Sequence, residues 1–239
     1  MFVFVTSPIL IQSPIPLDQW LKTGLNVLGK NLVPLILISL VMLVLTCVAS
    51  LLILPLIFVI GPIYYSMYAA AIKGIQGRQI IFEDAWTGFR ERFWEGTKVI
   101  LFQGLVLFLP LLIGGFFIFG AIFIAKAQHN DIVILLGGIF GVLLALSWIV
   151  YFFYMGCCLF LMFPIVIDRR LEVMEAFHLS RRAAHVDFWR YFIFYFLSMV
   201  LSSLGSFLFS IGIFITWPLI FLFTAAAYQS MLGFRGSPT

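Results

Sequence analysis

The stretch DRRLEVMEAFHLSRRAAHVDFWR, Asp168 to Arg190, decides the fold together with the segment that follows it. This charged stretch leads directly into a segment without charge, Tyr191 to Phe234. One helix needs about 20 apolar residues to cross a bilayer, so the uncharged segment has about twice the required length. We therefore predict that the charged stretch forms an amphipathic element at the membrane surface and that a transmembrane helical hairpin follows it.

The same arrangement occurs twice more along the chain. LDQWLKTGLNVLGK precedes an uncharged run from Asn31 to Ile72, and FEDAWTGFRERFWEGTK leads into the run from Val99 to Ala125. Gly61-Pro62-Ile63 in the first hairpin also aligns with Trp217-Pro218-Leu219 in the last one. We predict three tandem repeat-like units, each an interfacial helix followed by two spans, over residues 17–72, 82–167 and 171–234. The alternative is a chance similarity within a biased composition.

The composition is that of a membrane protein, because 63% of the residues are hydrophobic and only 10% are charged. Backbone groups in lipid must be hydrogen-bonded within the protein, and each unpaired group costs several kcal/mol. The long uncharged runs must therefore be helical. The sequence predicts an all-α fold, a polytopic transmembrane helical bundle that forms a single membrane domain over residues 1–239.

The number of spans depends on the run from Ile132 to Ile167, which is long for one helix and short for two. If this run crosses once, six spans result and every Lys and Arg except Lys126 lies on one side. Crossing twice would move the arginines of the Asp168 to Arg190 stretch to the other side, which the positive-inside rule disfavours. We predict a multi-pass membrane protein with both termini in the cytoplasm. The predicted spans are Leu32 to Ser50, Ile53 to Ile72, Val99 to Ala125, Ile132 to Ile167 with a bend near Gly156 to Pro164, Tyr191 to Phe209, and Ile213 to Met231.

The three charged segments show the periodicity of amphipathic helices. Phe82, Trp86, Phe89 and Phe93 recur three or four residues apart, which places them on one stripe of a helix. In the segment before the last hairpin, an apolar stripe (Val173, Phe177, Ala184, Phe188, Tyr191) is separate from a polar one (Glu175, His178, Arg182, His185). Short helices of this kind lie in the interface plane. They contact either lipid or the cytoplasmic ends of the spans.

Three motifs carry a resemblance that covers nearly the whole chain: LDQWLKTGLNVLGKN, GPIYYSMYAAAIKG followed by FEDAWTGF, and PIVIDRRLEVMEAFHLSRR. With these motifs the chain resembles a group of poorly characterised bacterial inner-membrane families. They are similar to the membrane domain fused to some glycerophosphodiester phosphodiesterases. The resemblance implies this architecture and a bacterial inner membrane. It transfers no catalytic residue, because none of these motifs belongs to a soluble phosphodiesterase domain.

The polar stripe before the last hairpin holds the best candidates for a site. Zinc helices place two histidines four residues apart, whereas His178 and His185 are seven apart with Arg182 between them. A face that contacts lipid headgroups or a partner therefore suits His178, Arg181, Arg182 and His185 better than a metal site does. No motif indicates a catalytic, cofactor-binding or metal site. The predicted partners are membrane lipids, including anionic headgroups, and a second copy or another membrane protein, but not nucleic acid.

Small residues recur every four positions along two of the predicted spans. Ser198, Ser202 and Ser206 form one such stripe, and Gly137 and Gly141 form another. Stripes of this kind let helix backbones approach closely. We expect them at seams within the bundle or at a dimer interface.

Three classes of function fit these patterns. The first is a non-enzymatic membrane scaffold, assembly or lipid-interacting module. The alternative is a carrier or channel for an apolar or lipid-like molecule, which the repeats, the prolines within spans and the 28 phenylalanines favour. The predicted spans carry no charged residue, which argues against an ion-driven transporter. The third class is a membrane enzyme, which would need carboxylates and histidines that converge at the cytoplasmic interface.

Overall fold

The computed structural model describes residues 17–51, 53–127, 131–207 and 213–234, and all secondary structure within them is helical. The fold is therefore all-α, as the composition predicts. The first elements are α1 (Leu17–Lys30), α2 (Leu32–Ser50), α3 (Ile53–Ile75), the 3-10 helix η1 (Phe82–Trp86), α4 (Thr87–Arg90) and α5 (Phe93–Ala127). They are followed by α6 (Asp131–Leu159), α7 (Met162–Arg169), α8 (Val173–Val186), α9 (Phe188–Phe207) and α10 (Ile213–Leu232).

Four helical segments in the described part of the chain are long and apolar enough to cross a membrane. They are Leu32–Ser50 in α2, Phe93–Lys126 in α5, Ile132–Arg169 across α6 and α7, and Phe214–Leu232 in α10. The apolar part of α9 that the structure describes, Phe188–Leu204, is shorter. Membrane-spanning helices are thus supported, whereas the six spans and the three repeats stay predictions.

Helix boundaries agree with the prediction at two informative places. The first hairpin has its helices at Leu32–Ser50 and Ile53–Ile75, close to the predicted spans. The predicted bend between Gly156 and Pro164 is also present, because α6 ends at Leu159 and α7 begins at Met162. Both follow from the same constraint, since an uncharged run that is too long for one span has to turn or bend.

The second interfacial segment differs from the single amphipathic helix that its periodicity predicts. The structure divides it into η1, α4 and the first turns of α5. Gly88 lies directly against α3: its N–H donates to Ser66 Oγ at 2.9 Å, and a Cβ in its place would collide with the carbonyl oxygen of Pro62. The segment follows the surface of α3, and this contact with protein explains why it is not one straight helix at the interface.

The core lies where α3, α7, α9 and α10 meet, and aromatic side chains fill it. The ring of Tyr68 stacks on Phe163 at 5.1 Å between centroids and meets Phe221 edge-on at 4.8 Å. Large rings of this kind bury 150–250 Å² each and dominate the energetics of a core. The largest fully buried aromatic residues are Trp20, Tyr191, Tyr228, Phe194, Phe221 and Phe223.

The first interfacial helix, α1, is held to this core. Trp20 is 1% exposed, its ring meets Phe194 edge-on at 4.5 Å, and its indole N–H donates to Ser230 on α10. Gly24 faces Phe223, where a Cβ would lie 2.9 Å from a ring carbon. The buried face of α1, with Trp20, Gly24, Val27 and Leu28, therefore contacts protein.

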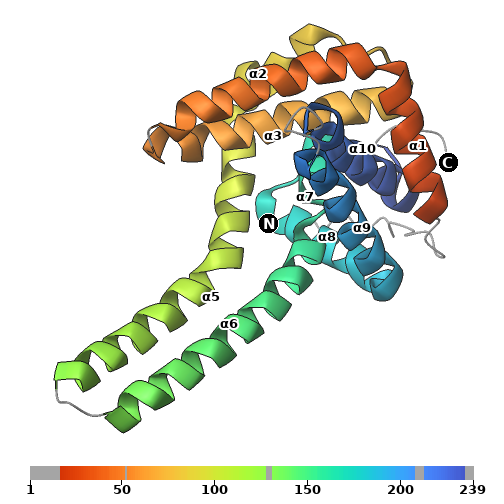
Figure 1. The fold of residues 1–239 in the computed structure, drawn as a ribbon. Coiled ribbons are helices and arrows are strands. Elements are labelled where there is room, and N and C mark those ends of the chain that lie inside the picture. The colour runs from red at the N-terminus through yellow and green to blue at the C-terminus, as the bar shows by residue number, and fades with distance from the viewer. Residues whose placement is uncertain (1–16, 52, 128–130, 208–212, 235–239) are drawn as a thin grey trace, which may run out of the picture.

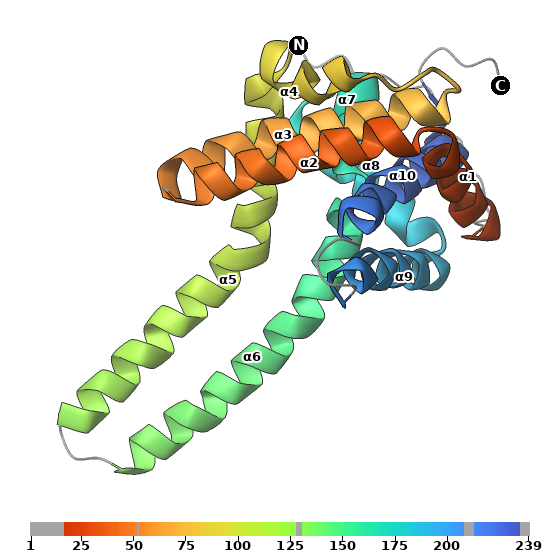
Figure 2. The same cartoon turned by 45° about the horizontal axis from the view of Figure 1, so that its top comes forward.

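The helices α5 and α6 form a hairpin that extends away from the core (Figures 1 and 2). Every side chain at residues 104–124 of α5 and 132–150 of α6 is exposed or partly exposed. In this hairpin, each of the two helices makes more contacts with the other than with any further element, and α5 and α6 also contact α3 and α8, respectively. Its outer surfaces are apolar on all sides, as a bilayer requires of helices that lipid surrounds.

Proline interrupts α5, and a side chain of α6 satisfies the carbonyl that this leaves free. Pro110 has no N–H to donate to the carbonyl of Val106 four residues earlier. The hydroxyl of Tyr151 donates to that oxygen at 2.8 Å, and the indole N–H of Trp148 donates to the next carbonyl, Leu107, at 2.9 Å. α5 changes direction along its length (Figure 1), which is the usual effect of an internal proline.

Neighbouring helices satisfy the backbone at the break between α6 and α7 as well. Gln103 of α5 donates to the carbonyl of Leu159 at 3.3 Å, and Ser180 of α8 donates to the carbonyl of Cys158 at 2.6 Å. An unsatisfied carbonyl in an apolar environment costs several kcal/mol, so these contacts tie the three helices together.

Candidate functional site

The position of α8 is set by a line of small residues. Ala176, Ser180, Ala183 and Ala184 are buried, and Ser180 is bonded to the end of α6. Small side chains let the backbone of α8 lie close to the junction of α6 and α7. The opposite face of α8 is consequently turned outwards.

That outer face carries the four predicted site residues. His178, Arg181, Arg182 and His185 are all exposed. The Nε2 atom of His185 lies 3.1 Å from the hydroxyl of Tyr154 on α6. Within the described residues neither arginine takes part in an ion pair. The face therefore presents two guanidinium groups to whatever adjoins it.

The two histidines of this face lie far apart along the helix. His178 and His185 are separated by seven residues, about 10 Å along a helix. In the described part of the chain no three His, Cys, Asp or Glu side chains come together as metal ligands would. The structure does not bring the two histidines together, and it leaves the arginines in a row beside them.

A second feature lies at the start of α8, and the sequence analysis did not detect it. A groove is lined by Lys98, Leu101 and Phe102 of α5 and by Glu172, Val173 and Met174. The ring of Phe102 meets Phe177 of α8 at 5.4 Å and holds the two helices together there. Lys98 is the last charge before an uncharged run, which marks a membrane boundary. Nothing local in the sequence relates it to Glu172.

The predicted packing residues lie at two places. Gly137 and Gly141 face α5 across the hairpin seam, where a Cβ at Gly137 would lie 2.7 Å from Cγ1 of Ile122.

On α9, Ser198 is fully buried and the hydroxyl of Ser202 is buried. Neither hydroxyl has a hydrogen-bond partner among the residues described, and the same holds for Tyr191 Oη. The side chain of Ser206 lies outside the described part.

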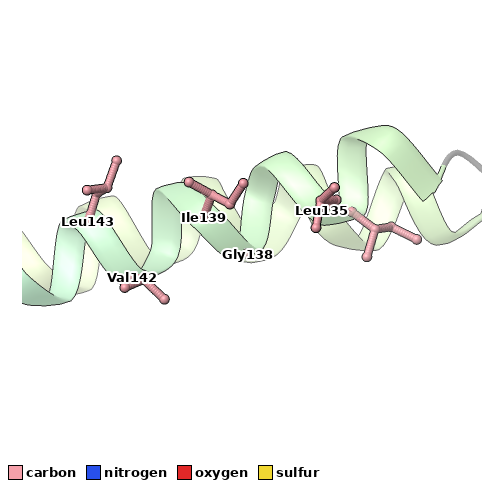
Figure 3. Close-up of a pocket in the computed structure, with 6 residues that line it drawn as sticks. Leu135, Gly138, Ile139, Val142 and Leu143 are labelled. Carbon is pink, nitrogen blue, oxygen red and sulfur yellow. The ribbon is translucent and has the colours of Figure 1, made fainter.

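The outer face of α6 is a continuous apolar surface. Figure 3 shows the side chains of Leu135, Ile139, Val142 and Leu143 spread along it, with Gly138 between them. No atom lies within 4 Å of the position that a Cβ on Gly138 would take. The glycine leaves a shallow notch that lipid or another apolar helix can contact.

Comparison with known proteins gives a family match over part of the chain. The family model described as "Protein of unknown function, DUF624" matches residues 35–119, less than half of the 239 residues. The matched region contains most of α2, all of α3, η1 and α4, and the larger part of α5. No curated protein and no solved structure matches the chain.

The matched region contains the contact of α3 with α4 at Gly88, and it ends before α6 and α8. The comparison gives no link to the membrane domain of glycerophosphodiester phosphodiesterases. The exposed face of α8 therefore has to be interpreted from its own chemistry.

Proposed function

We propose that this chain is a non-enzymatic membrane module of the inner membrane, a scaffold or assembly component, that binds anionic lipid headgroups through the exposed face of α8. The observation that carries the proposal is the two exposed basic groups, Arg181 and Arg182, which form no ion pair with any described residue and lie next to helices that are long and apolar enough to cross a bilayer. Each basic group close to an anionic membrane surface contributes roughly 1 kcal/mol to binding.

The depth of α8 relative to α5 supports this proposal. Lys98 and Lys126 are the charges that flank the apolar part of α5, and no charged residue lies between them. At 1.5 Å per residue the path along the helix between them is about 42 Å, enough to cross a hydrocarbon core of about 30 Å even though α5 changes direction along its length. Because Val173 and Met174 line a groove with Lys98, α8 starts at the level of the headgroups.

The apolar hairpin supports the assembly part of the proposal. Phe116 and Phe117 of α5 are 75% and 71% exposed, and Phe140 of α6 is 61% exposed. In a membrane such a surface contacts lipid or the helices of another membrane protein. A module with a basic face at the headgroups and an apolar arm in the bilayer can hold a partner at a defined depth.

The test compares lipid binding by the full-length chain and a double variant, Arg181→Gln with Arg182→Gln. Native mass spectrometry of the purified protein in detergent measures binding of an anionic, glycerol-headgroup phospholipid. Loss of two basic groups should weaken the affinity about 30-fold, the equivalent of about 2 kcal/mol. The matched control is Lys22→Gln with Arg78→Gln, which removes the same charge from exposed residues elsewhere.

The proposal requires that the control variant keep nearly all of its affinity. Equal losses in both variants would show a general effect of net charge, and no loss in either would show that the face of α8 contacts protein. Both results contradict lipid binding by α8. Protein-dependent movement of a fluorescent lipid analogue between the leaflets of reconstituted vesicles would instead support the alternative function, a carrier for lipid-like molecules.

A further inference from the structure

The groove at the start of α8 combines two opposite charges with an apolar lining. Lys98 projects from the first turns of α5, and Glu172 immediately precedes α8. The rest of the lining is apolar: Leu101, Phe102, Val173 and Met174. A ligand that fits here needs one negative group, one positive group and an apolar part.

Neither charged group of the groove is neutralised by the protein within the described residues. Other charges of the protein are paired, since Lys73 binds Asp84 at 2.8 Å and Arg92 binds Glu95. Lys98 and Glu172 take part in no such pair. Glu172 is the N-cap residue of α8, yet its side chain makes no capping hydrogen bond. Both groups are exposed and available to a ligand.

The groove continues into an apolar stripe of α5. Leu101, Leu105 and Leu112 follow one another on the same side of the helix and are 46%, 58% and 67% exposed. The path along α5 from Leu101 to Leu112, which includes Pro110, is about 16 Å long, close to half of a hydrocarbon core of about 30 Å. A ligand held by its charged end in the groove thus meets an apolar surface about as long as one leaflet is thick.

We infer that this groove binds a zwitterionic phospholipid with an amine headgroup, of the ethanolamine class. The lipid phosphate lies against the ammonium group of Lys98, the headgroup ammonium lies against the carboxylate of Glu172, and an acyl chain follows the leucine stripe. An anionic glycerol-headgroup phospholipid fits less well, because it has no positive group to pair with the Glu172 carboxylate. This site is separate from the face of α8, and it depends on the proposed function only in requiring a membrane.

The experiment measures binding of two lipids, an ethanolamine phospholipid and an anionic glycerol-headgroup phospholipid, to the full-length chain by native mass spectrometry. Lys98→Gln and Glu172→Gln should each weaken the ethanolamine lipid about fivefold, the loss expected for one charge contact. Glu172→Gln should in addition strengthen the anionic lipid, because it removes the repelling carboxylate. Lys126→Gln, at the other end of α5, should change neither affinity.

The two lipids respond oppositely to Glu172→Gln only if the carboxylate faces the headgroup. Equal weakening of both lipids, or no change for the ethanolamine lipid in either groove variant, would overturn the inference. Both residues are exposed, so thermal stability in detergent should match that of the native chain. Arg181→Gln with Arg182→Gln should leave the ethanolamine lipid bound. The experiment therefore distinguishes a failure of the proposal that α8 binds anionic lipid from a failure of the inference that the groove binds an ethanolamine lipid.

Discussion

The packed core and the α5–α6 hairpin both contain phenylalanines, but in different environments. Phe221 and Phe223 in the core are 1% and 0% exposed, whereas Phe116 and Phe117 in the hairpin are 75% and 71% exposed. Both pairs belong to helices that are long and apolar enough to cross a membrane, so this criterion does not distinguish the two regions. In a membrane an apolar side chain is stable against lipid and against protein alike. What separates the two regions is how closely the backbones approach.

Glycines make this difference in approach visible. In the core region, Gly61 of α3 and Gly96 of α5 face each other where the two helices meet. A Cβ on Gly96 would lie 2.6 Å from the Gly61 carbonyl oxygen. In the hairpin, a Cβ on Gly137 would meet only the side chain of Ile122, and nothing lies within 4 Å of such an atom on Gly120. Backbone atoms cannot move aside as a side chain can. The core should therefore tolerate added volume far less than the hairpin does.

The largest expected difference between the two regions is their accessibility from the two sides of the membrane. A cysteine at Asn130, which lies outside the described residues between α5 and α6, should react with an impermeant thiol reagent added outside intact cells. A cysteine at Arg182 should not react, because the positive-inside rule places α8 in the cytoplasm. The native Cys47, Cys157 and Cys158 are replaced in both variants. Labelling at Arg182 from outside would contradict the predicted orientation.

The next largest difference is the change in the free energy of unfolding when one methyl group is added to a glycine. Gly88→Ala should destabilise the folded protein by about 3 kcal/mol, because the new Cβ collides with the backbone of Pro62. Gly120→Ala should stabilise it by about 0.5–1 kcal/mol, because alanine has the higher helix propensity and space is free. Unfolding of both variants in mixed micelles measures the two values. Effects of the same sign and size would remove the distinction between close and open packing.

The all-α fold class and most helix boundaries could be predicted from the sequence, because they depend on local properties of the chain. The length of an uncharged run decides whether one or two helices fit, and this placed the first hairpin and the bend between α6 and α7. Residues such as Trp20 and Phe163 were recognisable as apolar. Which of them face protein could not be read from the sequence, because lipid and protein interiors select the same side chains.

The groove of Lys98 and Glu172 illustrates what lies beyond sequence reasoning. In the sequence, each residue is a charged residue next to an apolar segment, without any further signal. Only the contact of α5 with α8 brings the two residues into one groove. The division of the second interfacial segment was missed for a similar reason. The periodicity of Phe82, Trp86 and Phe89 predicts a helix, but the contact of Gly88 with α3 decides the local path of the chain.

The smallest expected effect concerns a hydrogen bond that joins the two helices of the hairpin. Pro110 leaves the carbonyl of Val106 without its helical donor, and the hydroxyl of Tyr151 donates to that oxygen at 2.8 Å. Tyr151→Phe should therefore destabilise the protein by about 1–2 kcal/mol, the cost of a shielded carbonyl without a partner. Tyr154→Phe is the control, because that hydroxyl contacts the exposed His185 and should matter by less than about 0.5 kcal/mol.

A second substitution identifies the cause of the effect at Tyr151. Pro110→Ala restores a backbone N–H four residues after Val106, so the carbonyl gains a donor within its own helix. In that background Tyr151→Phe should cost less than about 0.5 kcal/mol, which gives a coupling energy of about 1 kcal/mol between the two positions. Unfolding of the four proteins of this cycle in mixed micelles gives the value. If Tyr151→Phe cost the same with and without Pro110, the hydroxyl would act through general packing of the seam, and the hairpin would be held together in the same way as the core.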